Sequence, residues 1–136
     1  MNRGKRVRVP LIRQVTISEC GVACLAMVFA YHKKKVSLEE IRDVCAVSSE
    51  GVTARRLVSV AESYGFISKG FRGVVNDLKE SSLPCILLWD VAHFVVLTGF
   101  SVKSFYLNDP LVGKIKISSD LFAKYFSGVY LTFELL

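Results

Sequence analysis

The 136-residue sequence lacks an apolar run long enough to cross a bilayer. Its longest uninterrupted apolar segment, residues 22–31, falls well short of the roughly 20 residues that a membrane-spanning helix requires. No small-residue cleavage site follows this run, because His32 and three lysines stand there instead, which argues against a secretory signal peptide. The mean hydropathy of +0.40 is nevertheless high, so we interpret the run as a helix buried on most of its faces.

Cysteine and histidine are scarce, and their spacing does not suit a metal site. Cys20 and Cys24 share one helix face, but no second Cys or His pair at zinc spacing follows, and Cys45 and Cys85 stand alone. Without an export signal, the four cysteines are expected to be free thiols rather than a disulfide framework. The sequence therefore predicts no metal and no cofactor for this domain.

Aromatic residues are absent among the basic residues near the amino terminus. Residues 1–8 carry Arg3, Lys5, Arg6 and Arg8, and the whole chain has a formal net charge of +6. Such an arm is attractive to anionic lipid headgroups or nucleic acid, although RNA-binding surfaces tend to interleave aromatic side chains with the cations. We interpret residues 1–8 as a solvated basic arm and expect no nucleic-acid partner.

The rest of the chain, residues 9–136, predicts one α+β domain in which helices come first and strands follow. The expected helices lie at 18–31, 37–44, 53–64, 75–79 and 120–126. Ser37 followed by Glu40 forms a capping box for the second of them. The expected strands are compact apolar runs bounded by turn residues, at 66–71, 85–89, 93–100, 105–108, 114–117 and 129–134. We expect the sheet to be mostly antiparallel.

Cys20 is the candidate nucleophile, because it falls at the amino end of the first predicted helix. Backbone N–H groups and the helix dipole stabilise a thiolate at such a position. Gly21, which follows, would leave room for a substrate backbone beside the sulfur. The competing interpretation is a small buried apolar residue, which is the usual role of a cysteine.

His93 and Asp109 are the candidate partners of that thiol. His93 opens an apolar strand and is held at its rim, whereas His32, beside three lysines at a helix end, is better explained as a surface cation. Asp109 ends the next strand, where its carboxylate is expected to accept a hydrogen bond from the Nδ1–H of His93 and leave Nε2 facing the thiol. A structural histidine and a simple Asn-Asp-Pro turn remain the alternatives.

Gln14 completes the set. A carboxamide six positions before Cys20 is suited to donate to the oxyanion of a tetrahedral intermediate, together with the backbone N–H of Cys20. As an isolated glutamine it would carry no information. The order glutamine, cysteine at a helix start, histidine opening a strand and aspartate ending the next strand is papain-like.

Three segments resemble the motifs of the C39 peptidases, the papain-like domains at the amino terminus of peptidase-containing ABC transporters. The cysteine motif is QVTISECGVAC at residues 14–24, the histidine motif is HFVVL at 93–97, and the aspartate motif is NDP at 108–110. The resemblance covers nearly the whole chain from Val9 onward. It favours an excised transporter domain over a free peptidase, and implies a monomer that works on the cytoplasmic side of a bacterial inner membrane.

The resemblance also implies an activity and a role for each motif residue. The reaction is removal of a leader peptide from a bacteriocin-type precursor by cleavage after Gly-Gly or Gly-Ala, coupled to export. Cys20 attacks, His93 shuttles the proton, Asp109 orients His93, and Gln14 with the Cys20 N–H forms the oxyanion hole. Cys24 packs beneath the site.

The partners follow from the same resemblance. They are an amphipathic leader helix bound in an apolar groove and the transporter's membrane and nucleotide-binding domains, and ATP with Mg²⁺ belongs to the nucleotide-binding domain. Gly21 and the small Ala92 are expected to line a narrow substrate channel. Two alternatives stay open, namely a catalytically silent leader-docking module and a papain-like acyl transferase that shares the thioester intermediate.

Overall fold

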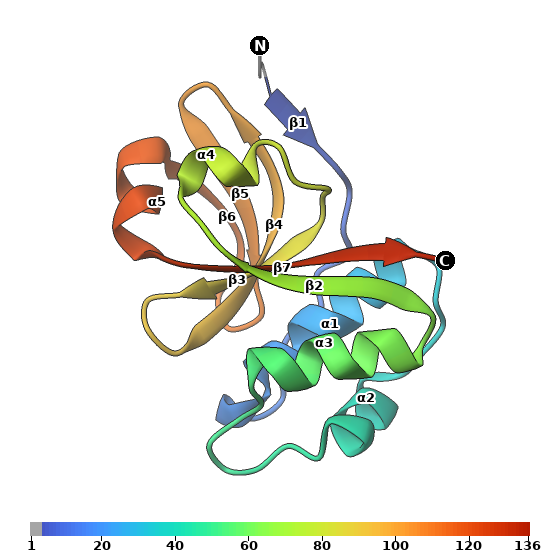
Figure 1. Ribbon diagram of the computed structural model, residues 1–136. Helices are drawn as coiled ribbons and strands as arrows, with labels where there is room; N and C mark the ends of the chain where they lie inside the picture. Colours follow the sequence, from blue (N-terminus) through green and yellow to red (C-terminus); the bar gives the residue numbers. More distant parts are fainter. Residues whose placement is uncertain (1–3) are drawn as a thin grey trace.

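The structure, a computed structural model, describes residues 4–136, so the first three residues of the predicted basic arm lie outside the described residues. Helices and strands follow one another much as the sequence predicts (Figure 1). The helical elements are η1 Ile17–Glu19, a 3-10 helix, and α1 Cys20–Tyr31, α2 Leu38–Cys45, α3 Ala54–Ser63, α4 Val75–Leu78 and α5 Ser119–Tyr125. The strands are β1 Gly4–Arg6, β2 Phe66–Arg72, β3 Cys85–Trp89, β4 His93–Ser101, β5 Ser104–Asp109, β6 Gly113–Ser118 and β7 Phe126–Leu135. The domain is α+β with a papain-like fold, as the sequence predicts.

Helices α1, α2 and α3 gather on one side of the sheet (Figure 1). Every residue of α1 from Gly21 to Phe29 is buried, which explains why the sequence of this helix is apolar on all faces. Ser37 and Thr53 cap α2 and α3 by accepting the backbone N–H groups of Glu40 and Arg56. Between residues 4 and 136, no helix combines the length and the apolarity needed to span a bilayer.

The sheet is antiparallel with strand order β2-β7-β3-β4-β5-β6, and β1 adds to β4. Strands β3 and β4 lie in its middle and are buried on both faces, which explains their uninterrupted apolar runs. Alternate residues enter different cores. Ile86, Phe94 and Val96 pack in the core around α1, whereas Leu87 and Val95 pack in the core beneath α5.

The sequence predicts a solvated basic arm, but part of this arm joins the sheet. Gly4–Arg6 forms β1, which pairs antiparallel with residues 99–101 of β4 while its side chains stay exposed. A Cβ at Gly99 would lie 2.6 Å from the carbonyl oxygen of Lys5, so only glycine lets the two strands approach this closely. The Arg6 guanidinium lies 4.0 Å from the centre of the Tyr106 ring, a cation–π contact that holds the arm on the sheet.

Candidate active site

Cys20 is the first residue of α1 and is half-buried. Helix α1 packs against β4, which brings the amino end of the helix to the sheet. A main-chain hydrogen bond from Phe94 reaches the Cys20 sulfur, so the thiol lies beside the first residues of β4. The expected helix start is confirmed to within one turn, because η1 Ile17–Glu19 precedes α1.

His93 and Asp109 meet because β5 runs antiparallel to β4. In such a pair the end of one strand lies beside the start of the other. The His93 imidazole Nε2 and Asp109 Oδ1 are 2.8 Å apart, and the same carboxylate oxygen accepts the Leu111 N–H at 2.8 Å. The turn after β5 therefore holds the carboxylate in place for the histidine.

The prediction that Nδ1 of His93 bonds to Asp109 is wrong, since Asp109 bonds to Nε2. The His93 side chain is also hydrogen-bonded to the Cys20 sulfur, and Asp109 already occupies Nε2. Nδ1 of His93 is therefore the nitrogen that faces Cys20.

The three groups shift one another's proton affinity toward an ion pair. Burial acts to raise the pKa of Cys20, but hydrogen bonds from the His93 side chain and the Phe94 backbone, with the charge of His93, lower it below its ordinary value. Hydrogen bonds to Asp109 and Cys20 raise the pKa of His93 to about 9. Burial also acts to raise the pKa of Asp109, yet the bonds to His93 and Leu111 hold it low. The arrangement favours a thiolate beside an imidazolium.

Gln14 lies next to the turn that holds Asp109, because its backbone N–H donates to the carbonyl of Pro110 at 3.0 Å. Its Nε2 donates to the carbonyls of Thr16 at 3.1 Å and Ile17 at 3.4 Å. An amide carries two N–H groups. Donation to an oxyanion therefore requires Gln14 to release the weaker contact, that to Ile17.

The two predicted substrate-lining residues differ in environment. Gly21 is buried, and a Cβ there would lie 2.7 Å from Cγ1 of Val52 and 3.2 Å from Cδ1 of Leu57. Close packing of α1 against α3, rather than room for substrate, explains this glycine. Ala92 is exposed immediately before His93, where it can border the site. Cys24 is fully buried one turn after Cys20, as expected for a packing residue.

Two residues near the site escaped the sequence-based prediction. Glu19, directly before Cys20, is buried and forms an ion pair with Arg42 of α2. Its Oε1 also accepts the backbone N–H groups of Val15 and Thr16, both at 3.2 Å. The spacing Thr16-x-x-Glu19 was an available signal, since it is that of a capping box. No local pattern indicates Arg42.

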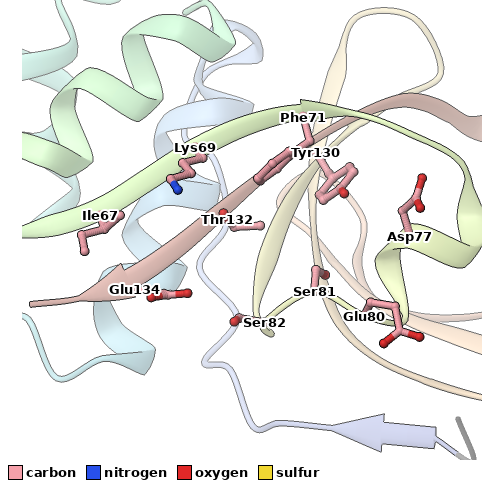
Figure 2. A pocket seen from close by; sticks show the side chains of 10 residues that line it. All are labelled: Ile67, Lys69, Phe71, Asp77, Glu80, Ser81, Ser82, Tyr130, Thr132 and Glu134. Atoms are coloured by element: carbon pink, nitrogen blue, oxygen red, sulfur yellow. The ribbon is translucent and has the colours of Figure 1, made fainter. Parts of the chain in front are cut away.

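A cleft of about 480 Å³ lies apart from these residues, on the face of β2 and β7 that looks toward α4 (Figure 2). We call it the β2–β7 cleft. Its apolar part is made by Ile67, Phe71 and Tyr130, with the rings of Phe71 and Tyr130 stacked 5.2 Å apart. Polar side chains surround them, namely Lys69, Asp77, Glu80, Ser81, Ser82, Thr132 and Glu134. An apolar centre with a polar rim is typical of a surface that binds another chain.

No group of three or more His, Cys, Asp and Glu side chains within the described part of the chain is arranged to hold a metal ion. Cys20, with His93 and Asp109 beside it, offers the chemistry of a polarised thiol. A cysteine at a helix start, a histidine and an aspartate on adjacent strands, and helices preceding an antiparallel sheet together define a papain-like cysteine peptidase.

The chain belongs to the peptidase C39 family, whose model matches residues 8–135. Among solved structures, a double glycine motif protease from an AMS/PCAT transporter, in complex with its leader peptide, has a TM-score of 0.94 and 45% identity. That alignment covers 96% of this chain and 94% of the other. The peptidase domain of Streptococcus ComA has the same fold, with a TM-score of 0.86 and 22% identity over 93% of this chain and 98% of that domain.

Two relatives from Escherichia coli are much longer than this chain. The colicin V secretion/processing ATP-binding protein of Escherichia coli is 36% identical over 91% of this chain. The probable microcin-H47 secretion/processing ATP-binding protein of Escherichia coli is 33% identical over 93%. The chain spans 18% of the length of each. The part of each that this chain matches is a C39 domain of a bacteriocin-processing transporter.

Proposed function

We propose that this peptidase removes the leader from a bacteriocin or other ribosomal peptide precursor by cutting after a Gly-Gly or Gly-Ala motif. The observation that carries the proposal is the Cys20–His93–Asp109 arrangement in a chain 45% identical to a double glycine motif protease that binds a leader peptide. Small residues before the cut suit a narrow approach to Cys20, bordered by Ala92.

In the proposed mechanism the Cys20 thiolate attacks the scissile carbonyl carbon, and the electrons of the C=O bond move to the oxygen. The oxyanion takes hydrogen bonds from the Cys20 backbone N–H and from Gln14, which exchanges its contact with Ile17 for this one. As the intermediate collapses, Nδ1 of His93 donates its proton to the leaving amine. A thioester to Cys20 and a free core peptide result.

Hydrolysis completes the cycle. A water molecule gives one proton to Nδ1 of His93 and its oxygen attacks the thioester carbon. Collapse of the intermediate breaks the C–S bond and releases the Cys20 thiolate and the leader acid, which loses its proton to solvent. Throughout, Asp109 keeps Nε2 of His93 engaged, which prevents the ring from turning and stabilises its charged form. These three side chains require no metal or cofactor for the reaction.

The relatives' transporter context supports proposals about partners. We propose that this domain works beside membrane and nucleotide-binding domains of an ABC transporter, on the cytoplasmic side of a bacterial inner membrane, so that cleavage is coupled to export. ATP and Mg²⁺ would act on the nucleotide-binding domain. The isolated domain is expected to be a monomer.

The β2–β7 cleft is our candidate surface for the leader. An amphipathic helix can lay its apolar face over Ile67 and Phe71, which are 44% and 41% exposed, while its polar face meets the charged rim. The cleft shares no lining residue with the Cys20–His93–Asp109 arrangement. Leader recognition and peptide cleavage would therefore use separate surfaces.

Incubation with a precursor whose leader ends in Gly-Gly, followed by mass spectrometry, tests the proposed activity. The wild-type domain should release leader and core with a free carboxylate at the cut. Cys20→Ala should bind the precursor and leave it intact, His93→Ala should lose nearly all turnover, and Gln14→Ala should be about 10² to 10³ slower.

Three other results would overturn the proposal. An intact precursor with wild-type enzyme would favour a leader-docking module. A leader carrying an added amine in place of the carboxylate would favour acyl transfer. Cleavage by Cys20→Ala would show that another group is the nucleophile.

A further inference from the structure

We propose that Glu19 and Arg42 form a clamp that positions the oxyanion-binding side of the active site. The inference rests on the proposed function, since it assigns two positioning residues to the same reaction. Neither residue is expected to touch the substrate. They act on the loop from Gln14 to Cys20, which carries both proposed oxyanion donors.

The Glu19 side chain binds several parts of this loop. The residue is 2% exposed, and its carboxylate accepts three groups: the N–H of Val15, the N–H of Thr16 and the guanidinium of Arg42. Burial acts to raise the pKa of Glu19, but the hydrogen bonds from Arg42, Thr16 and Val15 bring it below its ordinary value. The buried side chain is therefore a carboxylate whose hydrogen-bonding capacity is used to fold the loop.

A short series of contacts leads from this carboxylate to Gln14. Glu19 holds the N–H of Thr16, and the carbonyl of Thr16 in turn accepts the backbone N–H of Glu19 at 3.2 Å and Nε2 of Gln14 at 3.1 Å. The Thr16 residue is thus fixed at its N–H by Glu19 and orients the Gln14 amide with its carbonyl. A shift of this residue would move the amide relative to Cys20.

Arg42 supplies the fixed end of the clamp. It belongs to α2, which packs against α1, so the arginine ties the loop before α1 to a neighbouring helix 23 residues away in the sequence. Without Arg42, the buried Glu19 carboxylate would lose its positive partner, and buried carboxylates without one reorganise to reach water or a proton. The loop would then lose its fixed geometry.

A double-mutant cycle tests the clamp. Arg42→Ala should lower kcat for the Gly-Gly precursor about 10²-fold with KM unchanged, because displacement of a catalytic group by about an ångström costs that much. Combined with Gln14→Ala, the same change should cost little more, since its route runs through Gln14. Alkylation of Cys20 by iodoacetamide needs no oxyanion donor, so its rate and pH dependence should match wild type in Arg42→Ala.

Conservative variants separate positioning from stability. Arg42→Lys should recover most of the lost kcat because it restores the cation, and Glu19→Gln should lose less than Arg42→Ala because no charge remains buried. Tyr64→Phe is the matched control, because it removes a different side-chain bond between α2 and a neighbouring residue, the one to Glu40, and should leave kcat unchanged.

The outcomes that overturn the clamp are distinct from those that overturn the proposed function. Additive losses in the double mutant, a parallel loss of alkylation, or a lower melting temperature with unchanged kcat would each rule it out. A peptide aldehyde ending in Gly-Gly forms a hemithioacetal with Cys20 and places an oxygen at the same donors. The affinity of each variant for this aldehyde allows the same double-mutant cycle to be measured without turnover. The measurement works even if the enzyme leaves the precursor intact.

Discussion

At the scale of single residues, His93 stands between two groups that both favour its charged form. Asp109 holds Nε2 from one side, and the Cys20 sulfur lies on the side of Nδ1. The first partner fixes the ring, while the second exchanges a proton with it. The pair is thereby prepared in the form that attacks, whereas a free cysteine near neutral pH is mostly an unreactive thiol.

The pH dependence of cleavage follows from these shifts. The rate constant kcat/KM should rise as the Cys20 thiol ionises, below the pH at which an ordinary cysteine does, and fall as His93 loses its proton at about pH 9. Asp109→Asn keeps an oxygen that can accept from Nε2 but removes the negative charge. The alkaline limb should then move to lower pH, which a kcat/KM profile of both proteins would reveal.

The raised pKa of His93 also makes the stability of the fold depend on pH. Because His93 has a folded-state pKa of about 9 against an ordinary 6.5, its interactions stabilise the fold fully below pH 6.5, and this contribution is lost as pH rises through 9. Denaturation midpoints of wild type should therefore fall across that interval more than those of Asp109→Asn. If the alkaline limb of the kcat/KM profile did not move in Asp109→Asn, Asp109 would not be what raises the pKa of His93.

At the scale of elements, the position of Cys20 depends on how closely α1 approaches α3 and β4. Gly21 makes the approach possible, because a Cβ there would lie 2.7 Å from Val52, 3.2 Å from Leu57 and 3.3 Å from Phe94. Phe94 is also the residue whose main chain reaches the Cys20 sulfur. The packing of α1 against Phe94 therefore also fixes the position of the Cys20 sulfur.

Gly21→Ala should therefore destabilise the domain by about 1–3 kcal/mol, the usual cost of overpacking a core. Denaturant unfolding measures this loss directly. Gly70→Ala in β2 is the matched control, because its Cβ would meet one side-chain atom, of Leu131, at 3.3 Å and should change stability much less. Equal unfolding free energies for the two variants would contradict the packing explanation.

Elements whose sequence signals lie within a few residues could be predicted, and those that depend on distant contacts could not. The caps Ser37 and Thr53 and the central apolar strands have signals within a few residues, so the sequence locates them well. Strand β1 has no such signal, since it is three exposed residues that depend on the close approach at Gly99. A basic arm of this kind looks identical in sequence to a solvated one.

The same distinction applies to the site. Cys20, His93 and Asp109 were available from the sequence, because each lies near the end of a predicted helix or strand. Gln14 has no such signal, and only its place in the C39-like motif at 14–24 singled it out. Which ring nitrogen meets Asp109 was not available from the sequence, since it depends on how the folded chain turns the His93 ring between Cys20 and Asp109. The pairing of Glu19 with Arg42 joins residues 23 apart through helix packing, which no local pattern encodes.

At the scale of the whole molecule, the active site lies where the helical part meets the sheet. Cys20 comes from α1, whereas His93 and Asp109 come from β4 and β5 (Figure 1). The β2–β7 cleft lies on strands near the opposite edge of the sheet order from β5 and β6. A peptide that bridged both places would be held at a distance from its cut site, with the intervening segment extended toward Cys20.

This separation predicts how a leader peptide should behave on its own. A leader that ends before the Gly-Gly motif should inhibit cleavage competitively by filling the β2–β7 cleft, yet leave the rate of Cys20 alkylation by iodoacetamide unchanged. Phe71→Asp should raise KM for the precursor about tenfold or more with kcat unchanged, since it removes binding shared by substrate and transition state. It should also weaken inhibition by the leader.

Val102→Asp provides the control for that substitution, because Val102 is an apolar residue, 71% exposed, in the turn after β4 and outside the cleft. Its KM should match wild type. If the free leader protected Cys20 from alkylation, or if Phe71→Asp and Val102→Asp had the same KM, the leader would bind at the catalytic side of the molecule. The separation of recognition from cleavage would then be wrong, although the Cys20 chemistry could still hold.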